Sequence, residues 1–191
     1  EVEIPFLEGS TGNNKVRLGQ EAKLMVTGDI VFEDGDDAID NQGEIVIEGS
    51  IKFGGGEDIL LQHGPKMIVK RGIDFGDGDD ILQTNGLLQI GDGPGGVDGF
   101  VVDGGAGFDE AYFWDQSGTL RQFPGYRVQN FERIYQQGGL WQYYGDLTHI
   151  PRVFIVESSD SSLRNIAAFD AEYPAKFKDF VQAGGDVVAY M

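Results

Sequence analysis

The sequence predicts an all-β fold built as a solenoid, in which the chain winds through successive coils of 21 or 22 residues. Three consecutive stretches, 28–48, 49–70 and 71–90, align with one another over this period. A phenylalanine, an aspartate, a glycine and an isoleucine recur at matched places. The matched sets are Phe32, Phe53 and Phe75; Asp37, Asp58 and Asp80; Gly43, Gly64 and Gly86; and Ile47, Ile68 and Ile90. A repeat of this length is typical of a parallel β-helix whose coils stack on one another.

Each repeat is expected to contain three short strands separated by glycine-rich corners. The strands show partial alternation of β-branched or aromatic residues with polar ones. In the second and third repeats they are 50–53, 58–62, 66–70, 72–75, 80–83 and 87–90. Glycine, asparagine and aspartate accept the positive φ that tight corners need. An antiparallel meander with coincidental similarity is the alternative, and four matched columns argue against it.

The repeat is expected to continue on both sides of these coils. Leu18 and Val26 fall one period before Ile39 and Ile47, which makes 16–27 most of an earlier coil. After Ile90 the phase is broken by a loop, and a glycine corner then returns with Asp109 in the place of the repeated aspartate. Further strands are predicted at 119–123, 126–128, 131–135 and 140–147. The predicted β-helix therefore covers 1–150, with its clearest repeats at 28–90 and irregular coils at 91–148.

Residues 151–191 have a different character and are predicted to form a C-terminal segment of mixed structure. A strand is expected at 153–157 and another at 187–190. Helical patterns lie between them, around 161–167 and 173–183. A solenoid needs its open end covered, because the terminal coil otherwise exposes core and strand edges. The segment is therefore either a cap on the solenoid or the beginning of an α/β module.

Composition narrows the classes of partner. The net charge is −18 and cysteine is absent. A strongly negative field repels nucleic acid and favours cations and basic partners. No disulfide or thiolate metal site is possible without cysteine. The chain has no apolar run near the ~18 residues of a membrane span, so no direct membrane insertion is expected. It begins at Glu1 without an initiator methionine, which favours a processed or subcloned fragment.

The later part of the chain resembles the passenger domains of bacterial autotransporters. The motifs that carry the resemblance are GGAGFDEAYF and VQNFERIYQQGGLWQYYGDL, within a likeness covering about 16–148. The matching positions are Gly104, Gly105, Gly107, Asp109, Phe131, Glu132, Gly138, Gly139, Trp141, Gly145 and Asp146. The resemblance implies a right-handed parallel β-helix exported through the outer membrane. Such passengers are displayed at the bacterial cell surface as stalks or adhesins, and some carry an enzymatic head.

The repeated aspartates are the candidate metal ligands. Stacking places Asp37, Asp58 and Asp80 in one column at a spacing of ~5 Å, with Asp109 following. Two unit charges at that distance repel by roughly 3 kcal/mol at an effective dielectric near 20. Backbone N–H bonds within the turns, screening by water, or bound calcium would relieve this repulsion. The corners also partly resemble the GxGxD calcium-binding repeats of RTX proteins.

The sequence favours a non-catalytic extracellular role, as a stalk or adhesin with a host receptor, cell-surface receptor or glycan as partner. One alternative is a calcium-binding repeat module that stabilises a secreted protein. The other is a polysaccharide lyase or hydrolase built on a β-helix, where paired carboxylates would act on a sugar. No nucleophile, zinc-protease or nucleotide-binding motif is present. His63 and His149 are expected to be ordinary surface residues. The aromatic residues around Tyr112 and Trp141 mark either a sugar-binding surface or core packing.

Overall fold

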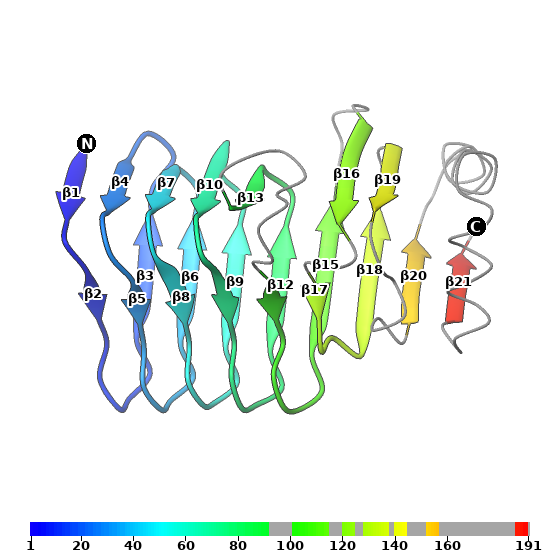
Figure 1. Ribbon diagram of the computed structural model, residues 1–191, viewed down its shortest axis with the longest axis horizontal. Helices are drawn as coiled ribbons and strands as arrows, with labels where there is room; N and C mark the ends of the chain where they lie inside the picture. Colours follow the sequence, from blue (N-terminus) through cyan, green and yellow to red (C-terminus); the bar gives the residue numbers. More distant parts are fainter. Residues whose placement is uncertain are drawn as a thin grey trace.

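The described part of the chain is all-β and forms a parallel β-solenoid of about five turns, as the repeat predicts (Figure 1). The computed structural model describes residues 1–91, 101–114, 120–124, 128–137, 140–144, 152–156 and 186–190. Side chains are described for 1–91, 101–114 and 128–135. Across this part of the chain, no helix combines the length and the apolar character that crossing a bilayer requires.

Successive strands of one coil belong to three different sheets, and every strand pairs in parallel with its counterpart in the adjacent coil (Figure 1). The first sheet contains β1 (Val2–Ile4), β4 (Lys23–Val26), β7 (Glu44–Ile47), β10 (Lys66–Val69) and β13 (Leu88–Ile90). The second contains β2 (Leu7–Glu8), β5 (Ile30–Val31), β8 (Ser50–Lys52), β11 (Gly72–Asp74), β14 (Val102–Asp103) and β17 (Val128–Gln129). The third contains β3 (Lys15–Leu18), β6 (Ala38–Asn41), β9 (Ile59–Gln62), β12 (Ile81–Thr84), β15 (Glu110–Trp114), β18 (Arg133–Gln137), β20 (Arg152–Val156) and β21 (Asp186–Tyr190).

Two strands outside these sheets, β16 (Leu120–Pro124) and β19 (Leu140–Tyr144), pair in parallel with each other. The strands expected at 153–157 and 187–190 correspond to β20 and β21, which extend the third sheet. The predicted loop after Ile90 and the predicted helical patterns between 161 and 183 lie outside the described residues.

The predicted phenylalanine column is confirmed. The Phe32 and Phe53 rings lie 5.5 Å apart between centroids, and the Phe53 and Phe75 rings are stacked at 4.9 Å with 5° between their planes. All three side chains are at most 3 % exposed. Identical rings stack in this way because the parallel register places each residue over its counterpart at the strand spacing.

The predicted isoleucine column is wrong at its middle member. Ile47 pairs with Val69, and Val69 pairs with Ile90, whereas Ile68 pairs with Val46. The cause is the corner of the second repeat. Three residues separate β9 from β10, but only two separate β6 from β7. A one-residue offset moves a side chain to the other face of a strand, so Val69 is fully buried and Ile68 is not.

The alignment of the first coil also needs a correction. Ile39 pairs with Val16, and Leu18 pairs with Asn41. The turn between β3 and β4 is two residues longer than its counterpart between β6 and β7. An offset of two leaves the inward face unchanged, so Leu18 still packs against the core. Val26 pairs with Ile47 as predicted.

The corner between the third and first sheets is held by buried polar side chains. Asn41 donates from Nδ2 to Gln62 Oε1 over 2.6 Å. Gln62 donates from Nε2 to the Gly64 carbonyl over 2.8 Å, and the Thr84 hydroxyl donates to the Gly86 carbonyl over 3.1 Å. The last inward residue of the preceding strand therefore bonds to each matched glycine: it donates to the carbonyl of Gly64 and Gly86, whereas Asn41 Oδ1 accepts the N–H of Gly43.

Glycine is required where the second sheet turns into the third. Gly76 has φ = 99°, a conformation that side-chain-bearing residues rarely adopt. A Cβ at this position would also lie 1.9 Å from the Gly54 carbonyl oxygen of the preceding coil. The close stacking of coils therefore excludes a side chain here for two separate reasons.

We expect Gly76→Ala to destabilise the protein by at least the ~1–3 kcal/mol of a strained non-glycine conformation, with the steric overlap adding to this. Gly19→Ala is the matched control, because a Cβ at Gly19 meets no atom within 4 Å, and its effect should stay within ~0.5 kcal/mol. Urea denaturation of both variants measures the difference. Equal stabilities would contradict the account of this corner.

Candidate functional site

The candidate site is the corner that carries the repeated aspartates. Isolated bridges join Asp34 to Gly55, Gly55 to Asp77 and Asp77 to Ala106, so the corners of successive coils stack in register. The last residue of each corner precedes a strand of the third sheet. This residue is Asp37, Asp58, Asp80 or Asp109 in successive coils. All four are buried, with no more than 1 % of each residue exposed. The four candidate ligands predicted from the sequence therefore do form one column inside the solenoid.

Each buried aspartate accepts a backbone hydrogen bond from the preceding coil. Its Oδ1 atom receives the N–H of the residue that occupies the same place one coil earlier. The N–O distances are 2.6 Å from Asn14 to Asp37, 2.7 Å from Asp37 to Asp58, 2.8 Å from Asp58 to Asp80 and 2.9 Å from Asp80 to Asp109. The column thus supplies acceptors for N–H groups at a corner where the strand ladder is interrupted.

Two exposed acids that directly precede buried aspartates, Asp36 and Asp79, act in the opposite direction along the axis. Asp36 Oδ1 accepts the N–H of Glu57 over 3.0 Å, and Asp79 Oδ1 accepts the N–H of Phe108 over 2.9 Å. In both cases the donor belongs to the following coil. The adjacent acids of the third repeat therefore hold both neighbouring coils: Asp79 holds the next one, and Asp80 holds the previous one.

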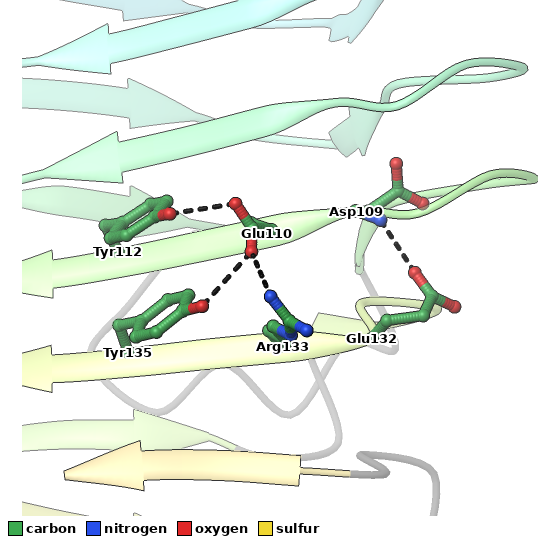
Figure 2. A network of polar contacts seen from close by, with 6 residues as sticks. All are labelled: Asp109, Glu110, Tyr112, Glu132, Arg133 and Tyr135. Atoms are coloured by element: carbon green, nitrogen blue, oxygen red, sulfur yellow. Dashed lines mark hydrogen bonds and ion pairs between the residues drawn. The ribbon is translucent and has the colours of Figure 1, made fainter.

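Both columns have distinct ends that the sequence reasoning missed. Asn14 occupies the aspartate position of the first coil and donates from Nδ2 to Asp37 Oδ1 over 2.8 Å. At the other end, Glu132 accepts the N–H of Asp109 over 2.7 Å (Figure 2). The exposed acids Asp36 and Asp79 belong to a second, outer column, and Asn13 ends this column by accepting the N–H of Asp36. Asn14 lies 23 residues before Asp37, and Glu132 lies 23 residues after Asp109. This spacing is longer than the repeat of 21 or 22 residues used to align the columns, so the alignment did not include these two residues.

A glycine of the GGAGFDEAYF segment interrupts the phenylalanine column. The register of β11 with β14 places Gly104 beside Phe75, and a Cβ on Gly104 would lie 2.2 Å from the Asn130 carbonyl oxygen. Phe131 of the following coil packs edge-on against Phe75 instead, with 6.0 Å between ring centroids. Gly104 and Phe131 therefore both have packing roles in the core of the solenoid.

The second oxygen of each buried carboxylate determines the electrostatics of the column. Within the described residues, Oδ2 of Asp37, Asp58, Asp80 and Asp109 is buried and has no hydrogen-bond partner. Burial raises the pKa of Asp80 to about 7 and the pKa values of Asp58 and Asp109 to about 6, from an ordinary value of 3.8. The backbone hydrogen bond opposes this rise, and neighbouring negative charges add to it.

The column can lower its charge by binding protons or a cation. Calcium prefers six to eight oxygen ligands. The described residues contain no group of three or more histidine, cysteine or acidic side chains placed to hold one metal ion. The calcium assignment to the four aspartates thus stays a prediction.

His63 lies at a corner with its Nδ1 atom 3.2 Å from Asn85 Oδ1, and His149 lies outside the described residues.

Stability should fall as pH rises through the range in which the column ionises. The folded pKa values of Asp58, Asp80 and Asp109 exceed the unfolded value of 3.8. Their contribution is therefore fully present below pH ~4 and is lost as pH rises through about 6 to 7. Each group contributes a slope of up to ~1.4 kcal/mol per pH unit. Urea denaturation from pH 4.5 to 8.5 measures the slope.

Asp80→Asn should flatten this pH dependence, because asparagine retains an acceptor oxygen for the Asp58 N–H without a titrating proton. Asp79→Asn, at an exposed position, is the matched control: it removes only the smallest of the effects that raise the pKa of Asp80 and should keep most of the wild-type slope. A wild-type stability that rises with pH over this range would contradict the raised pKa values.

Comparison of the chain with protein-family models, with curated proteins and with solved structures gave no match. The columns and corners themselves are therefore the observations from which the function of this chain is inferred.

Proposed function

We propose that this chain is a non-catalytic passenger segment displayed at the bacterial cell surface, where it serves as a stalk or adhesin. The observation that carries the proposal is the use of the repeated acids. In the corners, Asp79 and Asp80 accept backbone N–H groups of the following and preceding coils. The repeated polar residues are thus used to join coils into a rod. The order of the autotransporter-like motifs supports the same function.

A rod of this kind suits display away from a surface. Its hydrogen bonds run along the solenoid axis, and strands add at ~4.8 Å per coil without altering the coils already present. The net charge of −18 keeps such rods soluble and separates them from one another. A stalk needs these properties, and an adhesin adds a recognition surface on the outside of the same coils.

Protease treatment of intact cells tests the location. In the organism that encodes this chain, external protease should release its peptides while a cytoplasmic marker protein stays intact. Peptides released only after lysis would contradict surface display. Binding of the purified chain to an array of glycans and to host-cell membranes then separates an adhesin, which binds, from a stalk, which does not.

The buried aspartate column favours a second candidate, a calcium-stabilised repeat module. The partnerless Oδ2 atoms of Asp37, Asp58, Asp80 and Asp109 are hard oxygen donors of the kind that calcium prefers. A cation in the column would also compete with the protons that the raised pKa values retain. Calcium bound only to the folded state would raise stability by mass action.

Calcium binding predicts a higher melting temperature in calcium than in chelator, with a larger difference at pH 8 than at pH 5. The Asp80→Asn variant should lose most of the difference, and Asp79→Asn should keep it. Melting curves of the wild-type protein that coincide in calcium and in chelator at pH 8 would reject this candidate function.

A further inference from the structure

A cluster of four polar side chains lies on β15 and β18 of the third sheet, apart from the aspartate column. Glu110 and Tyr112 come from β15, and Arg133 and Tyr135 come from β18 (Figure 2). Both tyrosine hydroxyls donate to the Glu110 carboxylate, Tyr112 to Oε2 over 2.8 Å and Tyr135 to Oε1 over 3.1 Å. Arg133 Nη1 lies 3.3 Å from the same Oε1 atom.

The two tyrosine rings are stacked on each other. The strand register pairs Tyr112 with Tyr135 directly. Their ring centroids lie 4.5 Å apart, with 6° between the ring planes. One face of each ring is therefore directed at the other ring. The ortho carbons beside each hydroxyl face the neighbouring ring. This arrangement leaves less ring face for a sugar, but it brings two phenols together.

One carboxylate in contact with two phenols favours one-electron oxidation of both. A phenol that loses an electron becomes strongly acidic, and a base within hydrogen-bond distance takes the proton as the electron leaves. A tyrosine hydroxyl is protonated at neutral pH, and burial and the hydrogen bond to Glu110 raise the pKa of Tyr112 further above its ordinary value. The proton must then leave with the electron, and Glu110 is the acceptor in contact.

We propose that Tyr112 and Tyr135 are a site of intramolecular dityrosine formation, with Glu110 as the proton acceptor. Each phenol gives one electron to the oxidant and one proton to the carboxylate, which passes it to solvent. The two phenoxyl radicals join through a new bond between ortho carbons, and the ortho hydrogens then move to the oxygens to restore both phenols. The net loss is two electrons and two protons. Hydrogen peroxide, acting through a haem peroxidase, accepts them and becomes two water molecules.

Such a bond would join adjacent coils covalently. It connects β15 to β18 and closes a loop between positions 112 and 135. A cross-link that closes a loop of this kind stabilises a fold mainly by restricting the unfolded chain. The modification would therefore strengthen the solenoid where its repeats are least regular, and it goes beyond the stalk or adhesin function, on which it does not depend.

Treatment of the purified full chain with a haem peroxidase and limiting hydrogen peroxide tests the proposal. We expect dityrosine fluorescence, an intact mass lower by two hydrogen atoms, and a cross-linked peptide pair joining positions 112 and 135. The yield per chain should not change on dilution, since the reaction is intramolecular. Cross-links found only between molecules, or only among other tyrosines, would overturn the proposal. The wild-type peptide map decides this point even if a variant fails to fold.

Variants test the roles of the individual groups. Tyr112→Phe should abolish the 112–135 peptide pair. Glu110→Gln retains the shape of the side chain but not its basicity, and should slow formation of that pair by about tenfold or more. Glu57→Gln, which removes an exposed carboxylate from a different corner, is the matched control and should react at the wild-type rate. Circular dichroism and melting curves establish that each variant is folded. A Glu110→Gln rate equal to wild type would refute the role of the carboxylate.

Discussion

The backbone hydrogen bonds that aspartate side chains accept at the corners hold this solenoid in register. Between the second and third sheets the chain turns too sharply for a continuous ladder of backbone pairs, and N–H groups at the turn need other acceptors. Asp58 Oδ1 receives the Asp37 N–H, and Asp80 Oδ1 receives the Asp58 N–H. Each coil can therefore end its ladder only because the next coil supplies a carboxylate. This dependence makes the coils cooperative units, and explains why the acid recurs with the period of the fold.

The same arrangement places negative charge in the core. A buried carboxylate with one oxygen satisfied and the other without a partner resists ionisation, because burial disfavours the charged form. The raised pKa values of Asp58, Asp80 and Asp109 are the consequence. An asparagine would supply the same acceptor oxygen without this penalty, whereas the Asn14 side chain of the first coil instead donates to Asp37. The acid in the later coils makes the stability of the rod depend on pH, and on any cation that can reach the column.

The sequence predicted the architecture because stacking imposes a period on residue type. Phe32, Phe53 and Phe75 had to match, since each ring packs against the next. The error at Ile68 comes from assuming that this period is the same in every corner. Corners tolerate one extra residue, and a count from the repeated glycine cannot detect the offset that brings Val69 to the inward face. For the aspartate column, the sequence predicted which acids align. It did not predict the directions of their hydrogen bonds or the ends of the column at Asn14 and Glu132, because these depend on corner geometry that residue spacing does not encode.

The outward-facing residues follow a different rule from the inward ones. On the third sheet an inward column keeps one kind of side chain, since Ile39, Leu60, Leu82, Ala111 and Ile134 are all apolar and buried. The outward column beside it changes along the coils and runs Asp40, Leu61, Gln83, Tyr112 and Tyr135. Burial in the core does not fix the residue type at the outward positions, so the side chains there change from coil to coil. The paired tyrosines and their shared glutamate belong to this outward set, and a receptor or glycan that distinguishes this rod from other solenoids would have to contact the same set of residues.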